Sequence, residues 1–440
     1  MPRTRADGPR TPADEAATGT GVRSRPRAAL PALCATQITG WGVVYYAFPV
    51  LAPRITAATG WSPAATTAAF SGALLVSALA GIPLGRVLDR RGPRAVMTAG
   101  SVLAVVALVT IACAPDLAVF TAGWLLAGVA MAATFYRPAF AALTRWWGED
   151  RVRALTVVTL AGGLASTVFA PLTAVLAEHL TWRATYLVLA GVLAVVTIPG
   201  HALALRAPWP PAAAPHLAPG PASGPAVERS RPFLLLAAAL TLSGCAMYAV
   251  VMGLVPLLIA RGATPTEAAW ILGLGGVGQT LGRLLYATLA RRTGTTARTV
   301  ALIAAGGVTT AALALIPGPL PLLALVAIAA GTVRGNLTLL QATAVTDRWG
   351  VAQYGRLSGL LTAPASLAAA LAPFAGAALA GALGHPRLFL VLAALSLAAA
   401  ALSLGATPPL AVGCAPARRR RPWGRDAGPG KRGRKTGQPR

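Results

Sequence analysis

The sequence predicts an all-α, polytopic membrane protein with twelve transmembrane helices in two pseudo-symmetric six-helix bundles. Of its 440 residues, 55% are hydrophobic and only 11% are charged, whereas a soluble domain is usually about 25% charged. The charges lie in short islands between apolar runs of about 20 residues, the length that a helix needs to cross a bilayer. These runs are continuous, which excludes the shorter, alternating strands of a membrane barrel.

Twelve apolar runs predict the spans, and the widest interruption divides them into six and six. This interruption, residues 206–232, is rich in Pro, Ala and Gly, so it cannot bury a core and is predicted to be a flexible linker. The predicted spans are 30–52, 65–88, 95–114, 117–141, 154–177, 184–205, 233–260, 265–290, 298–316, 320–343, 355–382 and 386–406.

The basic residues predict the orientation of the chain. Of 38 Lys and Arg, 30 lie in the tails, the linker and the loops of one side, and four lie in the opposite loops. Because cytoplasmic loops carry the excess of basic residues, both termini are expected in the cytoplasm, with the protein in the plasma (inner) membrane. The expected order is a disordered N-tail, a first bundle, the linker, a second bundle and a disordered basic C-tail, over 1–29, 30–205, 206–232, 233–406 and 407–440.

Composition and spacing also exclude several classes of protein. The net charge of +26 is spread over loops and tails instead of one face, so no nucleic acid is expected as a partner. The basic C-tail is expected to contact anionic lipid head groups, or only to set the topology. The cysteines have neither metal nor redox spacing, and no catalytic set is present. We expect no enzyme activity, no cofactor, no metal and a monomeric protein.

The two halves echo each other at corresponding positions. Ser62–Pro63 and Thr264–Pro265 both place a capping hydroxyl before a proline at a helix start, and Glu267 completes a capping-box pattern in the second. The segments "DRRG" and "RRTG" then follow at matching distances, but the second lacks the acid, so a weaker latch is expected there. Repeated halves with a site between them are typical of transporters.

Two arginines lie inside apolar runs. Arg283 is about seven residues from the nearest polar end of its run, and Arg334 lies near the middle of its own. An arginine at the centre of a span costs about 2.5–3.5 kcal/mol, and buried charges are normally paired or in a water-filled cavity. Apart from Glu267 in the first turn of 265–290, none of the twelve spans contains Asp or Glu, so an incoming anion is expected to be the partner. For Arg283, snorkelling to the cytoplasmic side is the alternative.

Other side chains are expected to line the same site. Gln279 shares a helical face with Arg283, and two polar residues follow Arg334 on its face. In the first predicted span, aromatic residues lie one turn apart, either as packing or as cover for a substrate. Arg137 lies nearer the cytoplasmic end of its span, where snorkelling is the alternative. The candidate substrate-binding residues are Arg283, Gln279, Arg334, Gln341, Thr338, Trp41, Tyr45, Tyr46 and Arg137.

The loop segment "GRVLDRRGPR", residues 85–94, resembles the loop signature of the major facilitator superfamily. The residues on its key positions are Gly85, Asp89, Arg90, Gly92 and Arg94. In that superfamily the aspartate latches the loop against a neighbouring helix bundle in the outward-open state, so the resemblance implies a gating role for these five residues. The alternative is an ordinary positive-inside loop with one incidental acid.

A narrower resemblance is to bacterial relatives of the monocarboxylate porters within that superfamily. It rests on "TGWGVVYYAFP" in the first span, "RWWGEDRVRAL" before the fifth and "QTLGR" in the eighth. In those porters an Asp and an Arg four residues apart in span 8 meet the substrate carboxylate. Here Gln279 takes the Asp position and Arg283 the Arg position, and span 1 lacks the lysine that many members carry.

Together these features predict a transporter that works by alternating access on a small organic anion, such as a monocarboxylate. The alternatives are an efflux pump for amphipathic molecules or drugs and a membrane receptor or scaffold that moves no solute. The absence of Asp and Glu from the middle of the predicted spans argues against cationic substrates. Only His201 is placed to titrate within a span, so any proton movement is expected to pass through it or to accompany the substrate.

Overall fold

The computed structural model describes residues 26–209, 227–349 and 354–406, and within these ranges the regular structure is helical with no strand. The predictions for residues 1–25, 210–226 and 407–440, including the lipid contact of the C-tail, lie outside the described residues. The first half of the chain forms α2 (Ala29–Gly40), the π-helix η1 (Trp41–Tyr46), α3 (Ala47–Thr59), α4 (Pro63–Arg91), α5 (Pro93–Ala112), α6 (Leu117–Thr134), α7 (Tyr136–Trp147), the 3₁₀ turn η2 (Gly148–Asp150), α8 (Arg151–Gly163), α9 (Ala165–His179) and α10 (Trp182–Ala204).

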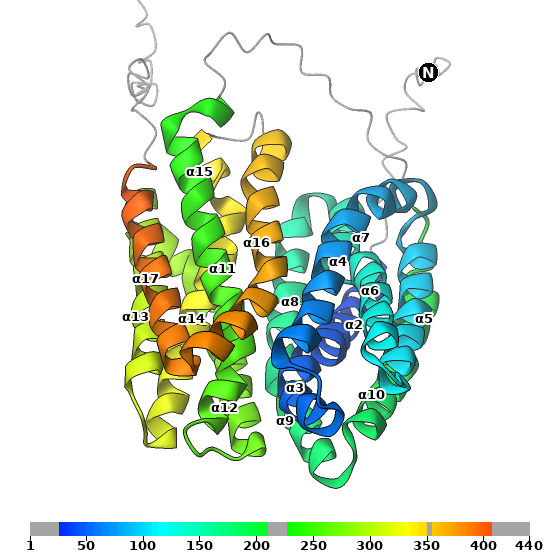
Figure 1. Cartoon of the computed structure of the whole chain (residues 1–440). Coiled ribbons are helices and arrows are strands. Elements are labelled where there is room, and N and C mark those ends of the chain that lie inside the picture. The colour runs from blue at the N-terminus through cyan, green and yellow to red at the C-terminus, as the bar shows by residue number, and fades with distance from the viewer. Residues whose placement is uncertain (1–25, 210–226, 350–353, 407–440) are drawn as a thin grey trace, which may run out of the picture. The chain divides into compact units, whose positions relative to one another are not determined.

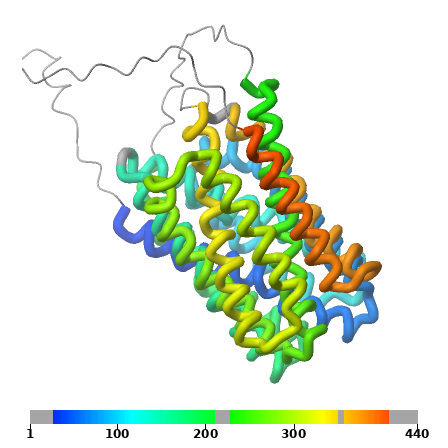
Figure 2. Tube along the Cα trace, turned by 90° about the vertical axis from the view of Figure 1, so that its left-hand side faces the viewer, coloured from blue at the N-terminus to red at the C-terminus, as the bar shows by residue number. Residues whose placement is uncertain are grey.

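The second half begins with the 3₁₀ turn η3 (Val227–Arg229). It continues with α11 (Arg231–Ile259), α12 (Pro265–Arg292), α13 (Thr295–Leu315), α14 (Leu320–Thr343), α15 (Thr346–Trp349), α16 (Tyr354–Leu383) and α17 (His385–Leu404). Figure 1 shows α2–α10 and α11–α17 as two neighbouring groups of helices, and Figure 2 shows the long helices running side by side. The all-α fold with two repeated halves is as predicted.

Ten stretches of the described residues are long and apolar enough to cross a membrane. Two more predicted spans fall short of that measure for local reasons. Residues 29–59 are helical throughout, but η1 divides them into shorter pieces. Helix α12 is 28 residues long, and it contains five glycines besides Gln279 and Arg283, which lower its hydropathy. With these two, the helices match the twelve predicted spans to within a few residues at most ends, but the first continues to Thr59 and the fourth to Trp147, beyond the predicted ends at 52 and 141.

Prolines account for two of the irregularities that the hydropathy pattern does not show. Proline has no N–H, and its ring clashes with the carbonyl four residues earlier. Pro49 lies four residues after Tyr45, in η1, and displaces the hydrogen bond of that carbonyl. Pro138 lies four residues after Thr134, where α6 ends and Phe135 adopts an extended conformation. The freed Thr134 carbonyl accepts a hydrogen bond of 2.7 Å from Gln37 Nε2.

The helix starts follow the predicted capping chemistry. Ser62 Oγ accepts a hydrogen bond of 3.1 Å from the Ala65 amide at the start of α4. At the start of α12, Thr264 and Glu267 form the complete capping box, in which the Glu267 carboxylate accepts the Thr264 amide at 2.8 Å. Both starts also carry proline in the first turn, whose missing N–H has no helical partner to lose.

Glycines bring α12 and α14 into backbone contact. A Cβ atom on Gly278 would overlap the Ile328 carbonyl, and one on Gly282 would overlap that of Thr332. In the opposite direction, a Cβ atom on Gly331 would overlap the Gly275 carbonyl, and one on Gly335 that of Gln279. Small residues allow such close approach in membrane helices, where packing replaces the hydrophobic effect as the driving force. The contact sets the spacing between the two helices that carry Gln279, Arg283 and Arg334.

Candidate substrate site

A cavity of about 270 Å³ lies between helices of both halves. Its aromatic wall is built around Trp41, whose ring stacks on Phe135 with 4.2 Å between centroids. The predicted residues Trp41, Tyr45 and Arg137 are brought together here. The full lining is Trp41, Tyr45, Leu74, Ser77, Ala78, Met131, Ala132, Phe135, Tyr136, Arg137, Tyr248, Ser366, Ala369 and Ala370.

Tyr136 and Tyr248 are cavity residues that the sequence reasoning missed. Tyr136 directly precedes Arg137 at the break caused by Pro138, and this Tyr-Arg-Pro segment was the available signal. Tyr248 lies in an otherwise apolar helix, and only its phenol distinguishes it from packing residues. Tyr46 is buried and packs against the Tyr45 ring, with 5.1 Å between centroids.

Arg334 is held by the side chain of Gln279. Its Nε donates to Gln279 Oε1 at 2.8 Å, while its Nη2 is buried without a partner among the described residues. The phenols of Tyr45 and Tyr248 lie near enough to interact with its charge. The contact joins α12 to α14 within one half, so it does not depend on how the halves are placed.

Two further predicted residues of α14 are not brought into this cluster. The Thr338 hydroxyl donates to the Arg334 carbonyl at 2.9 Å, the backbone bond that threonine commonly makes in apolar helices. Gln341 is half-buried, and we find no hydrogen bond from it to any described residue.

Arg283 contacts the opposite half of the protein. Its side chain is 7% exposed, and its Nη1 donates to the backbone carbonyl of Thr159 in α8. It also interacts with Tyr136, on the wall of the cavity. Its Nε has no partner within the described part of the chain. The guanidinium is thus buried in protein.

Two hydrogen-bond donors on the cavity wall, and two on the arginines that interact with its tyrosines, are buried without an acceptor among the described residues. They are Trp41 Nε1, Tyr45 OH, Arg283 Nε and Arg334 Nη2. The described Asp and Glu residues all lie at helix ends or in loops, outside the middle of the spans. Since buried polar groups normally find partners, the site has an excess of donors and of positive charge that a ligand rich in acceptors would satisfy.

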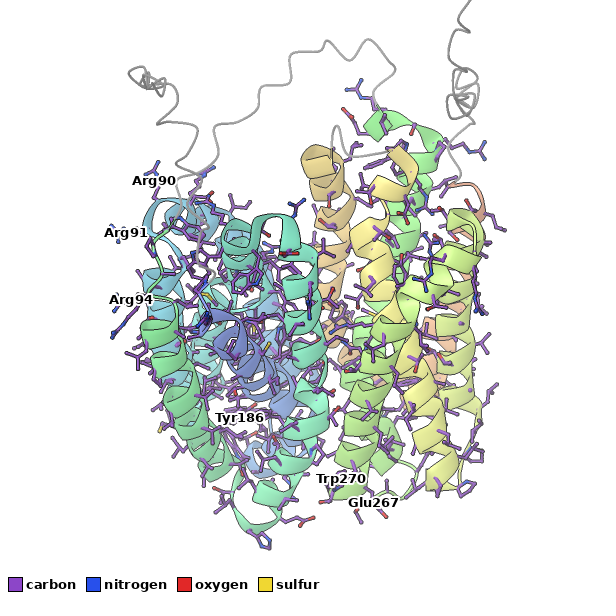
Figure 3. All side chains as sticks on the ribbon, turned by 180° about the vertical axis from the view of Figure 1, so that it is seen from behind. Arg90, Arg91, Arg94, Tyr186, Glu267 and Trp270 are labelled. Atoms are coloured by element: carbon purple, nitrogen blue, oxygen red, sulfur yellow. The ribbon has the colours of Figure 1, made fainter. Side chains whose placement is uncertain are left out.

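The two halves also meet along α9 and α12, from the start of α9 to its end opposite the loop motif. Thr167 in α9 donates to the Gly273 carbonyl in α12 at 3.0 Å, and the Thr266 hydroxyl bonds the Glu178 carboxylate at the end of the same helix pair. A Cβ atom on Gly276 would overlap Ser166 Oγ, so α9 and α12 pack closely here. Figure 3 shows Glu267 and Trp270 at this end and the loop arginines at the other.

The loop motif is organised around Asp89, which pairs with Arg145 of α7 in the same half. The two groups are 2.5 Å apart, and the Asp89 side chain is 59% exposed. Trp209, which follows α10, donates from Nε1 to the Asp89 carbonyl at 3.1 Å and lies 4.4 Å from the Arg145 guanidinium. Gly92 joins α4 to α5 with a φ of 78°, a backbone conformation that residues other than glycine rarely adopt. It packs on the Trp209 side chain.

The other motif residues are distributed around this pair. Gly85 lines a second cavity of about 180 Å³, together with Asp89 and Arg137. Arg137 therefore borders both this cavity and the central one. Arg90 is exposed, and Arg94 Nε donates to the Ala202 carbonyl at 2.9 Å.

The second half builds its ion pair from different residues. Arg298 in α13 donates to Asp347 in α15 at 2.7 Å, and the Arg298 side chain is only 4% exposed. Arg348 beside it donates to Thr299 Oγ1 at 2.7 Å, and burial lowers the pKa of its guanidinium. The acidic residue that the segment "RRTG" lacks is thus supplied by Asp347 in α15.

His201 is buried inside the first half. Its Nδ1 lies 2.7 Å from Ser101 Oγ, and Ser101 donates its own proton to the Met97 carbonyl at 3.0 Å. Nδ1 must therefore be the donor in this contact, which leaves Nε2 as a buried acceptor without a partner among the described residues.

Membrane-spanning helices in two repeated halves, with a cavity and buried cations between them, define a solute transporter that works by alternating access. The family model of the Major Facilitator Superfamily matches residues 33–337 and 234–430, and the chain belongs to this superfamily.

Among solved structures, the chain resembles a bacterial homologue of the human lysosomal transporter Spinster, in an inward-facing and unoccupied conformation. The TM-score is 0.67 at 14% identity, over 88% of this chain and 98% of that one. At this identity the likeness concerns the fold alone. No curated protein matches the chain.

Proposed function

We propose that this transporter carries a small organic anion, with a monocarboxylate as the preferred class, through the central cavity. The observation that carries the proposal is the excess of buried donors around it, at Trp41, Tyr45, Arg283 and Arg334. A carboxylate has two oxygens that together accept about four hydrogen bonds and one charge that offsets an arginine. A solute without acceptor oxygens would leave these donors unsatisfied, at a cost of about 1–3 kcal/mol for each neutral donor and more for a charged one, and an uncharged or cationic solute would leave the arginine charge without a counter-charge.

In this proposal the two arginines have separate tasks. Arg334, oriented by Gln279, offers its free Nη2 from within one half. When the substrate binds, Arg283 exchanges its hydrogen bond to the neutral Thr159 carbonyl of the opposite half for a bond to the charged carboxylate, which is a stronger acceptor. Trp41 and Tyr45 cover the apolar part of the substrate, and Arg137 borders its path towards Asp89. Without a carboxylate in the middle of the spans, proton movement accompanies the substrate or passes through His201.

We further propose that the described conformation is closed at the Glu178–Thr266 end. The hydrogen bond between Thr266 and Glu178 at that end, and the contacts of α9 with α12 further along the two helices, support this. By the distribution of basic residues, the opposite end, with Asp89 and both termini, faces the cytoplasm. The proposed location is the plasma (inner) membrane, and the proposed active form is a monomer.

The test is uptake by purified, full-length protein in liposomes. Labelled short carboxylates such as lactate are compared with their uncharged amides, which have nearly the same shape. The proposal requires saturable uptake of at least one carboxylate and none of the matching amide. Equal uptake of acid and amide would contradict it, and no flux of any solute would favour a receptor or scaffold.

Export of amphipathic molecules is a second candidate, favoured by another cavity. A largely apolar pocket of about 390 Å³ lies between both halves at the outer ends of α3, α4, α11 and α16, with Phe48, Met252 and Pro256 among its lining. It offers room for an apolar group but no buried charge. An uncharged amphipathic dye that is transported, and that competes with no carboxylate, would support this function over anion transport.

A further inference from the structure

Two arginines converge on one carbonyl at the cytoplasmic edge of the first half. Arg94, in the first turn of α5, donates from Nε to the Ala202 carbonyl at 2.9 Å. Arg206, just beyond the end of α10, donates from Nε to the same oxygen at 3.4 Å. The two Nε atoms are therefore within about 6.3 Å of each other, the sum of these distances.

Capping of α10 does not account for this arrangement. Ala202 lies in the last turn, where carbonyls lack helical partners and carry partial negative charge. The oxygen has two lone pairs and can accept both bonds, but one guanidinium is enough to cap the helix end, and a second adds repulsion between like charges. We find no ion pair for Arg94 or Arg206 within residues 26–209, 227–349 and 354–406. Both side chains are exposed, and each bond uses only Nε, so both terminal nitrogens remain for another acceptor.

The surroundings identify the kind of acceptor. Figure 3 shows Arg90, Arg91 and Arg94 together at one edge of this half, pointing away from the helices. On the membrane side of Arg206, the outward face of α10 exposes Leu203 (57%) and Val195 (75%). A ligand here therefore meets guanidinium groups at one end and apolar side chains at the other. An anionic phospholipid has this order of a phosphate head and apolar chains.

We propose that Arg94 and Arg206 bind the phosphate of an anionic phospholipid of the cytoplasmic leaflet, whose acyl chains lie along α10. Guanidinium groups suit phosphate because they offer paired donors in a fixed plane. The site is separate from the central cavity. Because Trp209 lies three residues after Arg206 and bonds the Asp89 carbonyl, the bound lipid would hold the start of the linker beside the loop motif.

The test is a lipid titration of purified, full-length protein in detergent, followed by thermal unfolding. Dioleoyl phosphatidylglycerol is the probe, with phosphatidylcholine as the zwitterionic lipid of zero net charge and inorganic phosphate as the soluble anion. The variant is Arg206→Ala, at an exposed position outside the motif and the substrate site. The control is Arg292→Ala, which removes one exposed arginine at the corresponding edge of the other half.

The proposal requires that phosphatidylglycerol raise the unfolding temperature more than phosphatidylcholine. Arg206→Ala should unfold like the wild type without lipid but need about tenfold more phosphatidylglycerol for half of the effect, the loss expected for one charge-assisted hydrogen bond to phosphate. Arg292→Ala should respond like the wild type. Equal responses of both variants would overturn the proposal. An equal effect of inorganic phosphate alone would show a site for free anions instead of lipid.

Discussion

Arg283 and Arg334 are both buried in the centre of the protein, but they are held in different ways. Arg334 is bound by the side chain of Gln279 within its own half. The two residues lie on α14 and α12, which pack closely through their glycines. Arg283 is bound by a backbone carbonyl of the opposite half, that of Thr159. Each keeps one nitrogen without a partner. Arg334 thus keeps its geometry when the halves move, whereas the contact of Arg283 with α8 depends on their separation.

This difference assigns a static and a movable role to two residues of the same type. A substrate anion adds to the contacts of Arg334 but competes with those of Arg283. Replacement of Arg334 should therefore affect affinity alone, and replacement of Arg283 should affect both affinity and the balance between conformations.

The packing that holds Arg334 should be the most sensitive. In Gly331→Ala the new Cβ atom meets the Gly275 carbonyl, which belongs to backbone and cannot rotate away. We expect a loss of about 1–3 kcal/mol in the free energy of unfolding, the range for overpacked cores. Thermal unfolding in detergent measures the effect. Gly244→Ala is the matched control, because a Cβ atom there meets nothing within 4 Å. Equal stability of the two variants would refute this account of α12 and α14.

Removal of either guanidinium should weaken anion binding. A charge-assisted hydrogen bond contributes about 1.5–3 kcal/mol, so Arg334→Ala and Arg283→Ala should each weaken carboxylate affinity by roughly ten- to a hundredfold. Calorimetric titration of folded protein measures the affinity, and Arg292→Ala serves as control for the loss of one positive charge. If both alanine variants bind like the wild type, neither arginine contacts the substrate.

The contact between the halves is open to a separate test. In Gly276→Ala the new Cβ atom meets side-chain oxygens of Ser166 and Thr167, which can move when the halves separate. We expect a bias towards opening at that end, seen as several-fold faster labelling of Thr167→Cys by an impermeant maleimide from outside. Gly275→Ala is the control, since its nearest neighbour is the Ala327 carbonyl at 3.4 Å within the same half. Unchanged labelling in Gly276→Ala would argue against a gate between α9 and α12.

The smallest effect on stability is expected at the loop motif. The Asp89–Arg145 pair is exposed, and such pairs contribute about 0–1 kcal/mol. Asp89→Asn should therefore insert and fold normally but slow transport, because the cytoplasmic contact of the loop is weakened. Substrate flux and surface expression are measured together. Normal flux at normal expression would remove the gating role.

Much of the fold could be predicted because the bilayer imposes it. A span needs a long apolar run, and hydropathy locates such runs to within a few residues. The break at Phe135 and the π-helix at Trp41–Tyr46 could not be located in this way, because both keep the apolar pattern. Pro138 and Pro49 were the available signals. The close contact of α12 with α14 was likewise present as spaced glycines, which a hydropathy reading treats as neutral.

The candidate site was predictable as far as charge is concerned. Arg283 and Arg334 stand out because each costs free energy in a bilayer. Their partners did not stand out, since pairing depends on the relative rotation of two helices. Gln279 and Arg283 share one helical face, but this does not show that Gln279 bonds Arg334 instead of Arg283. The face shared by Arg334 and Thr338 likewise does not show that the Thr338 hydroxyl bonds the backbone. Tyr136 and Tyr248 were missed because aromatic residues in apolar helices are mostly packing.

The most direct test of the central claim is the carboxylate affinity of Arg283→Lys and Arg334→Lys, measured by calorimetry on folded protein beside the wild type. Lysine keeps the charge but cannot make the planar, two-pronged contact with a carboxylate. If the arginines bind the substrate, Arg283→Lys should bind the carboxylate clearly more weakly, and Arg334→Lys should lose affinity in the same way. Wild-type affinity in Arg283→Lys alone would move the site to Arg334. Wild-type affinity in both variants would contradict anion recognition by these residues.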